Sequence, residues 1–139
     1  MNTLLTETLE CIAIESGDFD KSFGLVDRLI EDYGEADLTQ RLYADIDQSV
    51  PWEIVADLFS ILIWSTSDNG TSLTDVTEQW ITECDDERKI AIALNIDVYP
   101  FISEIEMINK LKLVADNFPN LKQRCMALIF SRTKNQTTH

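Results

Sequence analysis

The stretch that most constrains the fold is VPWEIVADLFSILIWST, residues 50–66, because apolar side chains fall on every side of a helix drawn through it. Pro51 stands in the first turn, where a helix tolerates proline, and the turn residues Asp68-Asn69-Gly70 follow the run. The run is too short to span a bilayer, and Glu53 and Asp57 interrupt it. We therefore expect a central helix of a soluble domain, covered by other helices on all sides.

Seven further segments have the apolar spacing or the capping residues of helices. Residues 90–96 alternate between large apolar and smaller residues, which is the period of a strand, but a lone strand would have no partner, so helix is preferred there. The sequence predicts an all-α protein of about eight helices in stacked antiparallel pairs, as an α-solenoid-like array or a compact irregular bundle. The seven segments are 4–15, 18–34, 37–46, 72–84, 85–96, 103–118 and 119–133.

Several polar residues are placed to cap these helices. Asp18 is expected to cap the segment 18–34, Asp37 and Gln40 to form a capping box at 37–46, and Ser103 and Glu106 to form one at 103–118. The second segment is amphipathic, and the stripe expected to face the core is Phe19, Phe23, Val26, Ile30 and Tyr33.

The length of 139 residues predicts one domain, over 1–133, followed by a polar and disordered tail over 134–139. A chain of this size can bury a core without a metal or a disulfide. Cys11, Cys84 and Cys125 are odd in number and far apart, and no signal peptide is visible. Free thiols in the cytoplasm are therefore expected.

The formal net charge of −14 restricts the partners. It argues against nucleic acid and anionic membranes, because lysine and arginine supply both of those attractions. The acids are also unevenly spread: residues 1–87 contain 21 acids and three bases, and residues 88–139 contain four acids and eight bases. A basic partner is favoured, and a solvated surface that serves only solubility is the alternative.

No catalytic or metal-binding pattern is present. The single histidine, His139, is the last residue, and four glycines are too few for a phosphate-binding loop. Without a histidine base, activation of a serine or cysteine nucleophile is improbable. Carboxylate pairs such as Glu104 and Glu106 are better explained as helix caps. We expect a protein that is not an enzyme and has no cofactor and no metal.

Two acidic clusters remain as candidate sites for a basic partner. The first, called here the 75–87 cluster, surrounds a predicted helix end and turn, and the second, the 27–35 cluster, lies where acids oppose a helix dipole. For each of them a solvated face is the alternative. The residues are Asp75, Glu78, Glu83, Asp85, Asp86 and Glu87 in the first, and Asp27, Glu31, Asp32 and Glu35 in the second.

The acidic stretch TDVTEQWITECDDE, Thr74–Glu87, together with the small helical build and the absence of a catalytic set, resembles the immunity proteins of bacterial polymorphic toxins, including contact-dependent growth inhibition systems. Many such toxins are basic nucleases. The resemblance implies a cytoplasmic immunity protein that binds a basic toxin and occludes its active site. It is a resemblance in overall character, and no functional residue carries over by alignment.

Two other functions fit the same features. An acidic mimic of nucleic acid would inhibit a DNA-binding protein and would place carboxylates at the spacing of phosphates along one face. A helical scaffold or adaptor would have no charge-dependent partner at all.

Overall fold

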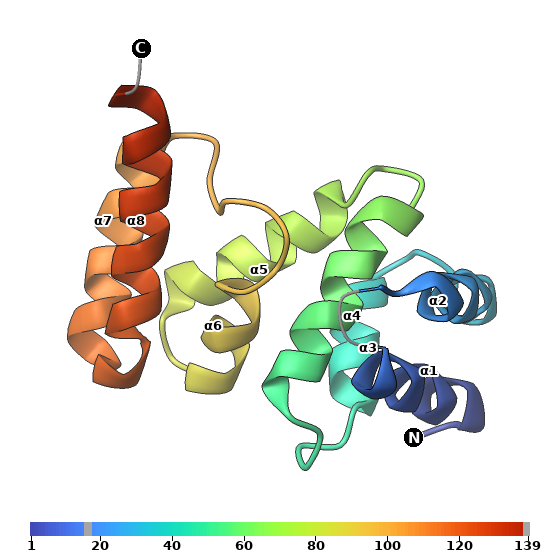
Figure 1. Ribbon diagram of the computed structural model, residues 1–139. Coiled ribbons are helices and arrows are strands. Elements are labelled where there is room, and N and C mark those ends of the chain that lie inside the picture. The colour runs from blue at the N-terminus through green and yellow to red at the C-terminus, as the bar shows by residue number, and fades with distance from the viewer. Residues whose placement is uncertain (16–17, 138–139) are drawn as a thin grey trace. The chain divides into compact units, whose positions relative to one another are not determined.

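The computed structural model describes residues 1–15 and 18–137, with the backbone alone for 135–137. Within these residues the chain is all-α, with eight helices, one short 3-10 turn and no strand, as predicted (Figure 1). The preference for helix over residues 90–96 is also confirmed, because α6 covers most of that segment. The helices are α1 (Thr3–Ile14), α2 (Asp20–Tyr33), α3 (Leu38–Asp45), α4 (Trp52–Ser65), α5 (Thr71–Glu83), α6 (Glu87–Ala93), α7 (Glu104–Asn117) and α8 (Lys122–Thr137), with the 3-10 turn at Pro119–Leu121.

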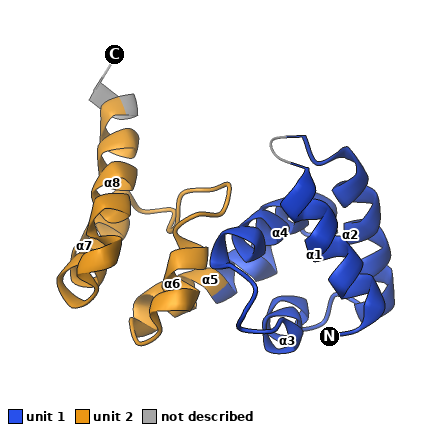
Figure 2. Cartoon of the chain, turned by 60° about the horizontal axis from the view of Figure 1, so that its bottom comes forward, with its two compact units in different colours: residues 1–76 blue, residues 77–139 orange. Residues whose placement is uncertain are grey.

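The chain forms two compact units, Met1–Val76 and Thr77–His139 (Figure 2). The boundary falls inside α5, so this helix contributes its first half to unit 1 and its second half to unit 2. Helix α8 continues to Thr137, into the segment 134–139 for which a disordered tail was expected. Whether residues 1–133 fold as one domain stays a prediction.

Unit 1 is built around α4, which packs against α1 and α2, while α1 and α2 pack against each other. The buried apolar residues of α1 and α3 are spaced by three or four positions, as burial of one helix face requires. The side chains that fill this core include Leu5, Leu9, Ile12, Val26, Leu29, Leu38, Leu42, Ile46, Val55, Leu58, Phe59, Ile61 and Leu62.

The expectation that α4 is covered on all sides is wrong on one face. Leu58 is fully buried, but Trp64 is 65% exposed. Glu53, Asp57, Ser60 and Trp64 are spaced by four, three and four residues, so they lie on one stripe of the helix. The two acids that interrupt the apolar run therefore mark a narrow face that is not buried, and Trp64 continues that face.

The first turn of α2 is held by Glu15 and not by Asp18, the predicted cap. Asp18 does not cap the helix; instead the Glu15 carboxylate accepts hydrogen bonds from the backbone N–H of Ser22 (2.8 Å) and of Lys21 (3.2 Å). The Ser22 hydroxyl donates to the same carboxylate at 2.6 Å. The hydroxyl of Ser22, followed by the backbone bonds and the Cys11 thiol, lowers the pKa of Glu15 from 4.5 to about 2.

This anchor also changes the buried face of α2. The buried residues are Ser22, Val26 and Leu29, whereas Phe23 of the predicted stripe is exposed. Ser22 faces inward because Glu15, at the end of α1, holds its hydroxyl. The apolar spacing alone therefore placed the inward face about one residue too far along the helix.

One predicted capping box is confirmed at its first bond and the other is wrong. The Ser103 hydroxyl accepts a hydrogen bond from the Glu106 N–H at 3.2 Å and caps α7. Asp37 has a φ of 53° in the left-handed region and makes no side-chain bond to α3. A capping side chain reaches the helix from an extended backbone, so this conformation turns the Asp37 carboxylate away from the α3 amides.

In unit 2, α7 and α8 pack against each other as a hairpin joined by the 3-10 turn. Two arginines of α8 hold the segment that leads into α7 by donating to its backbone carbonyls. Arg124 donates to the oxygen of Leu94 at 3.0 Å, and Arg132 donates to the oxygens of Phe101 (2.8 Å) and Ile102 (2.6 Å). No helix in the described ranges is long and apolar enough to cross a membrane.

A matched pair of substitutions on α4 tests its two faces. Leu58→Ala is expected to lower the free energy of unfolding by about 2–5 kcal/mol, because it leaves a cavity in the unit 1 core. Trp64→Ala is expected to change it by less than about 1 kcal/mol, because most of that side chain is exposed. Chemical denaturation measures both, and equal losses for the two variants would contradict the assigned faces.

The pH dependence of stability tests the Glu15 anchor. The folded pKa of about 2 lies below the ordinary 4.5, so folding favours the ionised carboxylate. Its contribution is fully present above pH 4.5 and is lost as the pH falls toward 2. The free energy of unfolding of the wild type should therefore exceed that of Glu15→Gln by a constant amount at neutral pH and by a shrinking amount in this acidic window.

The matched control for this measurement is Glu10→Gln, an exposed acid on the same helix whose replacement should not reproduce the effect. Denaturant titrations at a series of pH values give the comparison. A difference between wild type and Glu15→Gln that is independent of pH would refute the anchor.

Candidate interaction surface

Three acids of the 75–87 cluster have structural roles in unit 2. The Glu78 carboxylate accepts the backbone N–H of Phe101 at 2.7 Å. Phe101 is buried and has a φ of 65°. Asp86 is the N-cap of α6 and accepts the N–H of Lys89 at 3.1 Å. Glu87 lies in the first turn of α6 and accepts from the Asn120 amide at 3.4 Å. Structural bonds therefore explain half of this cluster.

The other three acids of this cluster, Asp75, Glu83 and Asp85, are exposed. Asp75 belongs to unit 1, and Glu83 and Asp85 belong to unit 2. The cluster is thus divided between the two units, and within unit 2 it offers two acids without a structural bond.

The 27–35 cluster lies wholly in unit 1, on the last turns of α2 and the loop that follows. All four of its carboxylates are on exposed residues. Asp27 and Glu31 are four residues apart, so two like charges face each other along the helix, and acids near a helix C-terminus oppose the dipole. Glu35 lies beyond the C-terminus of α2, and its carboxylate accepts the Ser67 hydroxyl at 2.9 Å.

Two bases lie close to this cluster in the sequence: Arg28, on α2 itself, and Arg41, which serves the backbone at the end of α2. The Arg41 guanidinium donates to the carbonyl oxygens of Ala36 (2.7 and 3.0 Å) and Gly34 (3.0 Å). It also lies 5.5 Å from the centre of the Tyr33 ring. The hydroxyl of Tyr33 donates to Asp45 at 2.7 Å, and burial followed by this bond raises the pKa of Tyr33 to about 12. Arg41 thus stabilises carbonyl groups, and the four acids of the 27–35 cluster outnumber Arg28, the one base within that stretch.

Hydroxyl groups hold several acids of unit 1 without neutralising them. The N–H and hydroxyl of one serine bind the same carboxylate in three places: Ser22 on Glu15, Ser67 on Glu35, and Ser72 on Asp68. At Glu15 and Asp68 these bonds stabilise the ionised form and lower the pKa of the carboxyl group. The acids are ordered, yet the negative charge stays.

The boundary between the units also separates the charge. Unit 1, residues 1–76, contains 16 acids and three bases, a net charge of −13. Unit 2, residues 77–139, contains nine acids and eight bases, a net charge of −1. Nearly all of the acidic excess therefore belongs to unit 1, including the 27–35 cluster.

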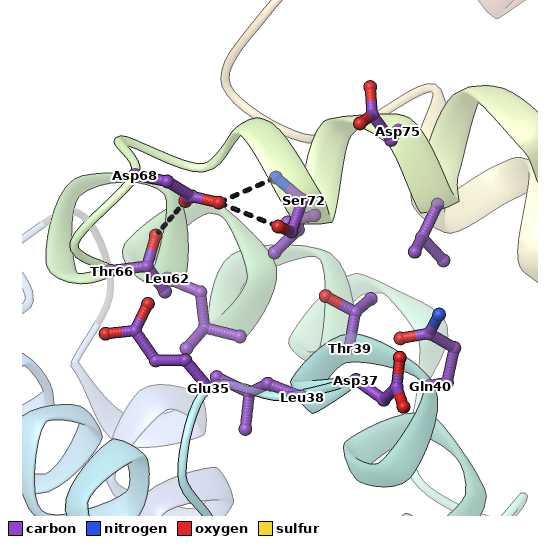
Figure 3. A pocket seen from close by; sticks show the side chains of 12 residues that line it. Glu35, Asp37, Leu38, Thr39, Gln40, Leu62, Thr66, Asp68, Ser72 and Asp75 are labelled. Atoms are coloured by element: carbon purple, nitrogen blue, oxygen red, sulfur yellow. Dashed lines mark hydrogen bonds between the residues drawn. The ribbon is translucent and has the colours of Figure 1, made fainter.

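Unit 1 also contains a pocket of about 220 Å³ between the start of α3, the end of α4 and the first turns of α5 (Figure 3). No basic side chain lines it. Four acids, four neutral polar residues and four apolar residues do: Glu35, Asp37, Asp68, Asp75, Thr39, Gln40, Thr66, Ser72, Leu38, Leu62, Leu73 and Val76.

Two of the pocket carboxylates are fixed by hydrogen bonds. Asp68 accepts the N–H and hydroxyl of Ser72 at 3.0 and 2.7 Å and caps α5, as the dashed lines in Figure 3 show. Glu35 is held by Ser67. Asp37 and Asp75 lie at the opposite end, and in Figure 3 the Asp75 carboxylate points away from the hollow. The pocket is therefore anionic, and at one end hydrogen bonds hold the carboxylates of Asp68 and Glu35 in fixed positions.

Sequence reasoning assigned Glu35 to one cluster and Asp75 to the other, and the structure brings both to the rim of this pocket. It treated Asp37 and Asp68 only as a cap and a turn residue, and it did not single out Thr39. The Glu35–Ser67 bond joins residues 32 positions apart, so no local pattern signals it. The capping of α5 by Asp68 from four residues before Ser72 was the one signal within reach of the sequence.

Within the described ranges, no group of three or more histidine, cysteine, aspartate or glutamate residues is arranged to hold a metal ion. The acids that line the pocket likewise form no such group. Comparisons with known proteins add no further assignment: no family model, no curated protein and no solved structure matches the chain.

Adjacent acids in the 75–87 cluster allow a test of the structural roles. Asp86→Ala is expected to lower the free energy of unfolding by about 0.5–2 kcal/mol, because α6 loses its N-cap. Asp85→Ala is expected to change it by no more than about 0.5 kcal/mol, because the side chain is exposed and does not cap the helix. Chemical denaturation of both variants gives the comparison, and an equal or reversed order would show that Asp85 is the cap.

Proposed function

We propose that the protein is a cytoplasmic immunity protein, without catalytic activity, that binds a basic bacterial toxin, such as a nuclease domain, and blocks its active site. The observation that carries the proposal is the net charge of −13 on unit 1. Acids that only keep a protein in solution need no particular distribution, whereas this excess is confined to one compact unit.

The 27–35 cluster supports a binding role for that charge. Its acids lie near the C-terminus of α2, where both the helix dipole and their own repulsion cost a few tenths of a kcal/mol each. Acids retained against a local cost are typical of a surface selected for something other than stability. The serine–carboxylate pairs hold acids of unit 1 in fixed positions, which suits recognition of fixed positive charges.

The physical mechanism is steering followed by occlusion. A nuclease active site is surrounded by lysine and arginine, because it binds phosphates. Complementary charge raises the association rate and selects the partner, and the bound helical unit then excludes the nucleic acid from the site.

The partner is identified by capture from a lysate of the native host with the full chain as bait, followed by mass spectrometry. We expect a basic protein that arrests growth when expressed alone and does not when this chain is expressed with it. A partner without a basic surface, or a toxicity that co-expression leaves unchanged, would refute the proposal. A captured DNA-binding protein without toxicity would instead favour the nucleic-acid mimic.

Charge-neutral triple variants then locate the surface. The test variant replaces acids of the 27–35 cluster, Asp27→Asn, Glu31→Gln and Asp32→Asn, and the control variant replaces Glu7→Gln, Glu10→Gln and Asp18→Asn. Both raise the net charge from −14 to −11, and all six residues are exposed. We expect the test variant to bind at least about tenfold more weakly at low salt, about 1.4 kcal/mol, mainly through slower association.

The control variant should bind nearly as tightly as the wild type, because its charges are removed elsewhere on unit 1. Equal weakening by the two variants would mean that only net charge matters. A third variant, Asp75→Asn, Glu83→Gln and Asp85→Asn, spares the structural acids Glu78 and Asp86 and reports on the 75–87 cluster. If it alone weakens binding, the contact surface lies there and not at the end of α2.

A further inference from the structure

We infer that the pocket of unit 1 binds the guanidinium group of a single arginine side chain, presented by the partner. The inference rests on the proposed function for the source of the arginine and on the pocket alone for its chemistry. Four acids and no base line the hollow, and the carboxylate of only one of them, Asp75, points away from it, so the group that enters it is a cation.

Thr39 is the independent observation that points to a ligand. Thr39 is 95% buried, and within the described part of the chain its hydroxyl makes no hydrogen bond. Figure 3 shows the hydroxyl oxygen turned toward the space between α3 and the first turn of α5. A donor bound in the pocket would give this hydroxyl the partner that the protein does not supply.

The size of the pocket limits the ligand to one side chain. Its 220 Å³ is below the roughly 300–1,000 Å³ of sites that hold drug-sized molecules. A nucleotide or an extended cofactor therefore does not fit, whereas the end of one long side chain does.

The arrangement of acceptors selects arginine over lysine. Two acceptors from different elements line the hollow, the Glu35 carboxylate after α2 and the Thr39 hydroxyl on α3, whereas both oxygens of Asp68 are already bonded to Thr66, Gly70 and Ser72. A guanidinium has five N–H donors in a plane and can serve several acceptors at once, whereas an ammonium is a compact and strongly hydrated point charge.

The apolar residues of the pocket support the same choice. Leu38 and Leu62 are buried side chains that line it together with the acids. A guanidinium is more weakly hydrated than an ammonium, so it tolerates such walls on its flat faces. The 27–35 cluster ends at Glu35, on the rim of the pocket, so a basic surface drawn to α2 meets the pocket at the edge of its contact.

The test titrates the full-length, nitrogen-15-labelled protein with N-acetyl-arginine amide and follows the backbone amide shifts by NMR. Saturating shifts are expected at Thr39, Ser67 and Ser72. The citrulline analogue, which has the same shape without the charge, should cause none, and the lysine analogue should bind more weakly than the arginine probe. Shifts that do not saturate, or equal binding of the lysine analogue, would overturn the inference.

Two variants connect the shifts to the pocket. Thr39→Val removes only the hydroxyl and is expected to weaken the arginine probe about three- to tenfold, and Glu35→Gln is expected to weaken it at least about tenfold. The matched control is Thr8→Val, also a buried threonine of unit 1, whose hydroxyl donates to Leu4 and lies outside the pocket. Unchanged binding in both pocket variants would overturn the inference even if one of them were destabilised.

The outcomes separate this inference from the proposed function. A captured partner that ignores the α2 acids would refute the proposed function while the probe still binds in the pocket. A probe that does not bind, beside a partner that needs those acids, would refute the pocket alone.

Discussion

Repulsion among the 16 carboxylates of unit 1 is the constraint on which the rest of the structure depends. Three bases cannot neutralise them, so the unit orders its acids with neutral donors. In three places one serine presents its N–H and its hydroxyl to a single carboxylate, and these pairs fix the start of α2, the loop after it and the cap of α5. The apolar core around α4 supplies the burial that offsets the remaining repulsion.

The serine–carboxylate hydrogen bonds connect stability with recognition. A salt bridge would have ordered each acid and removed its charge, whereas a serine orders the acid and keeps the charge. The anionic pocket follows from this, because Glu35 and Asp68 are both held by serines at its rim. In unit 2 the opposite holds: arginines such as Arg132 bind backbone carbonyls, and acids such as Asp86 cap helices, so its charges mainly maintain local structure.

Helix spacing predicted the all-α class, because apolar periodicity reflects burial directly, and the lack of a partner strand correctly favoured helix at 90–96 over its strand-like period. It failed where a long-range contact overrides local chemistry. Glu15 replaced Asp18 at the start of α2, and the left-handed backbone of Asp37 removed a predicted cap. The acids of both clusters were found as candidates, but Glu35 meets Asp68 and Thr39 only through the packing of α3, α4 and α5, which no local pattern encodes.

The acidic excess of unit 1 also governs how copies of the protein meet one another. Two copies that approach with these units facing repel each other, since a net charge of −13 on each side has too few bases opposite it. Unit 2 carries no net positive charge to set against it, since its nine acids outnumber its eight bases. Self-association through opposite net charges is thereby disfavoured, and the acidic unit of each copy is left for molecules that carry positive charge.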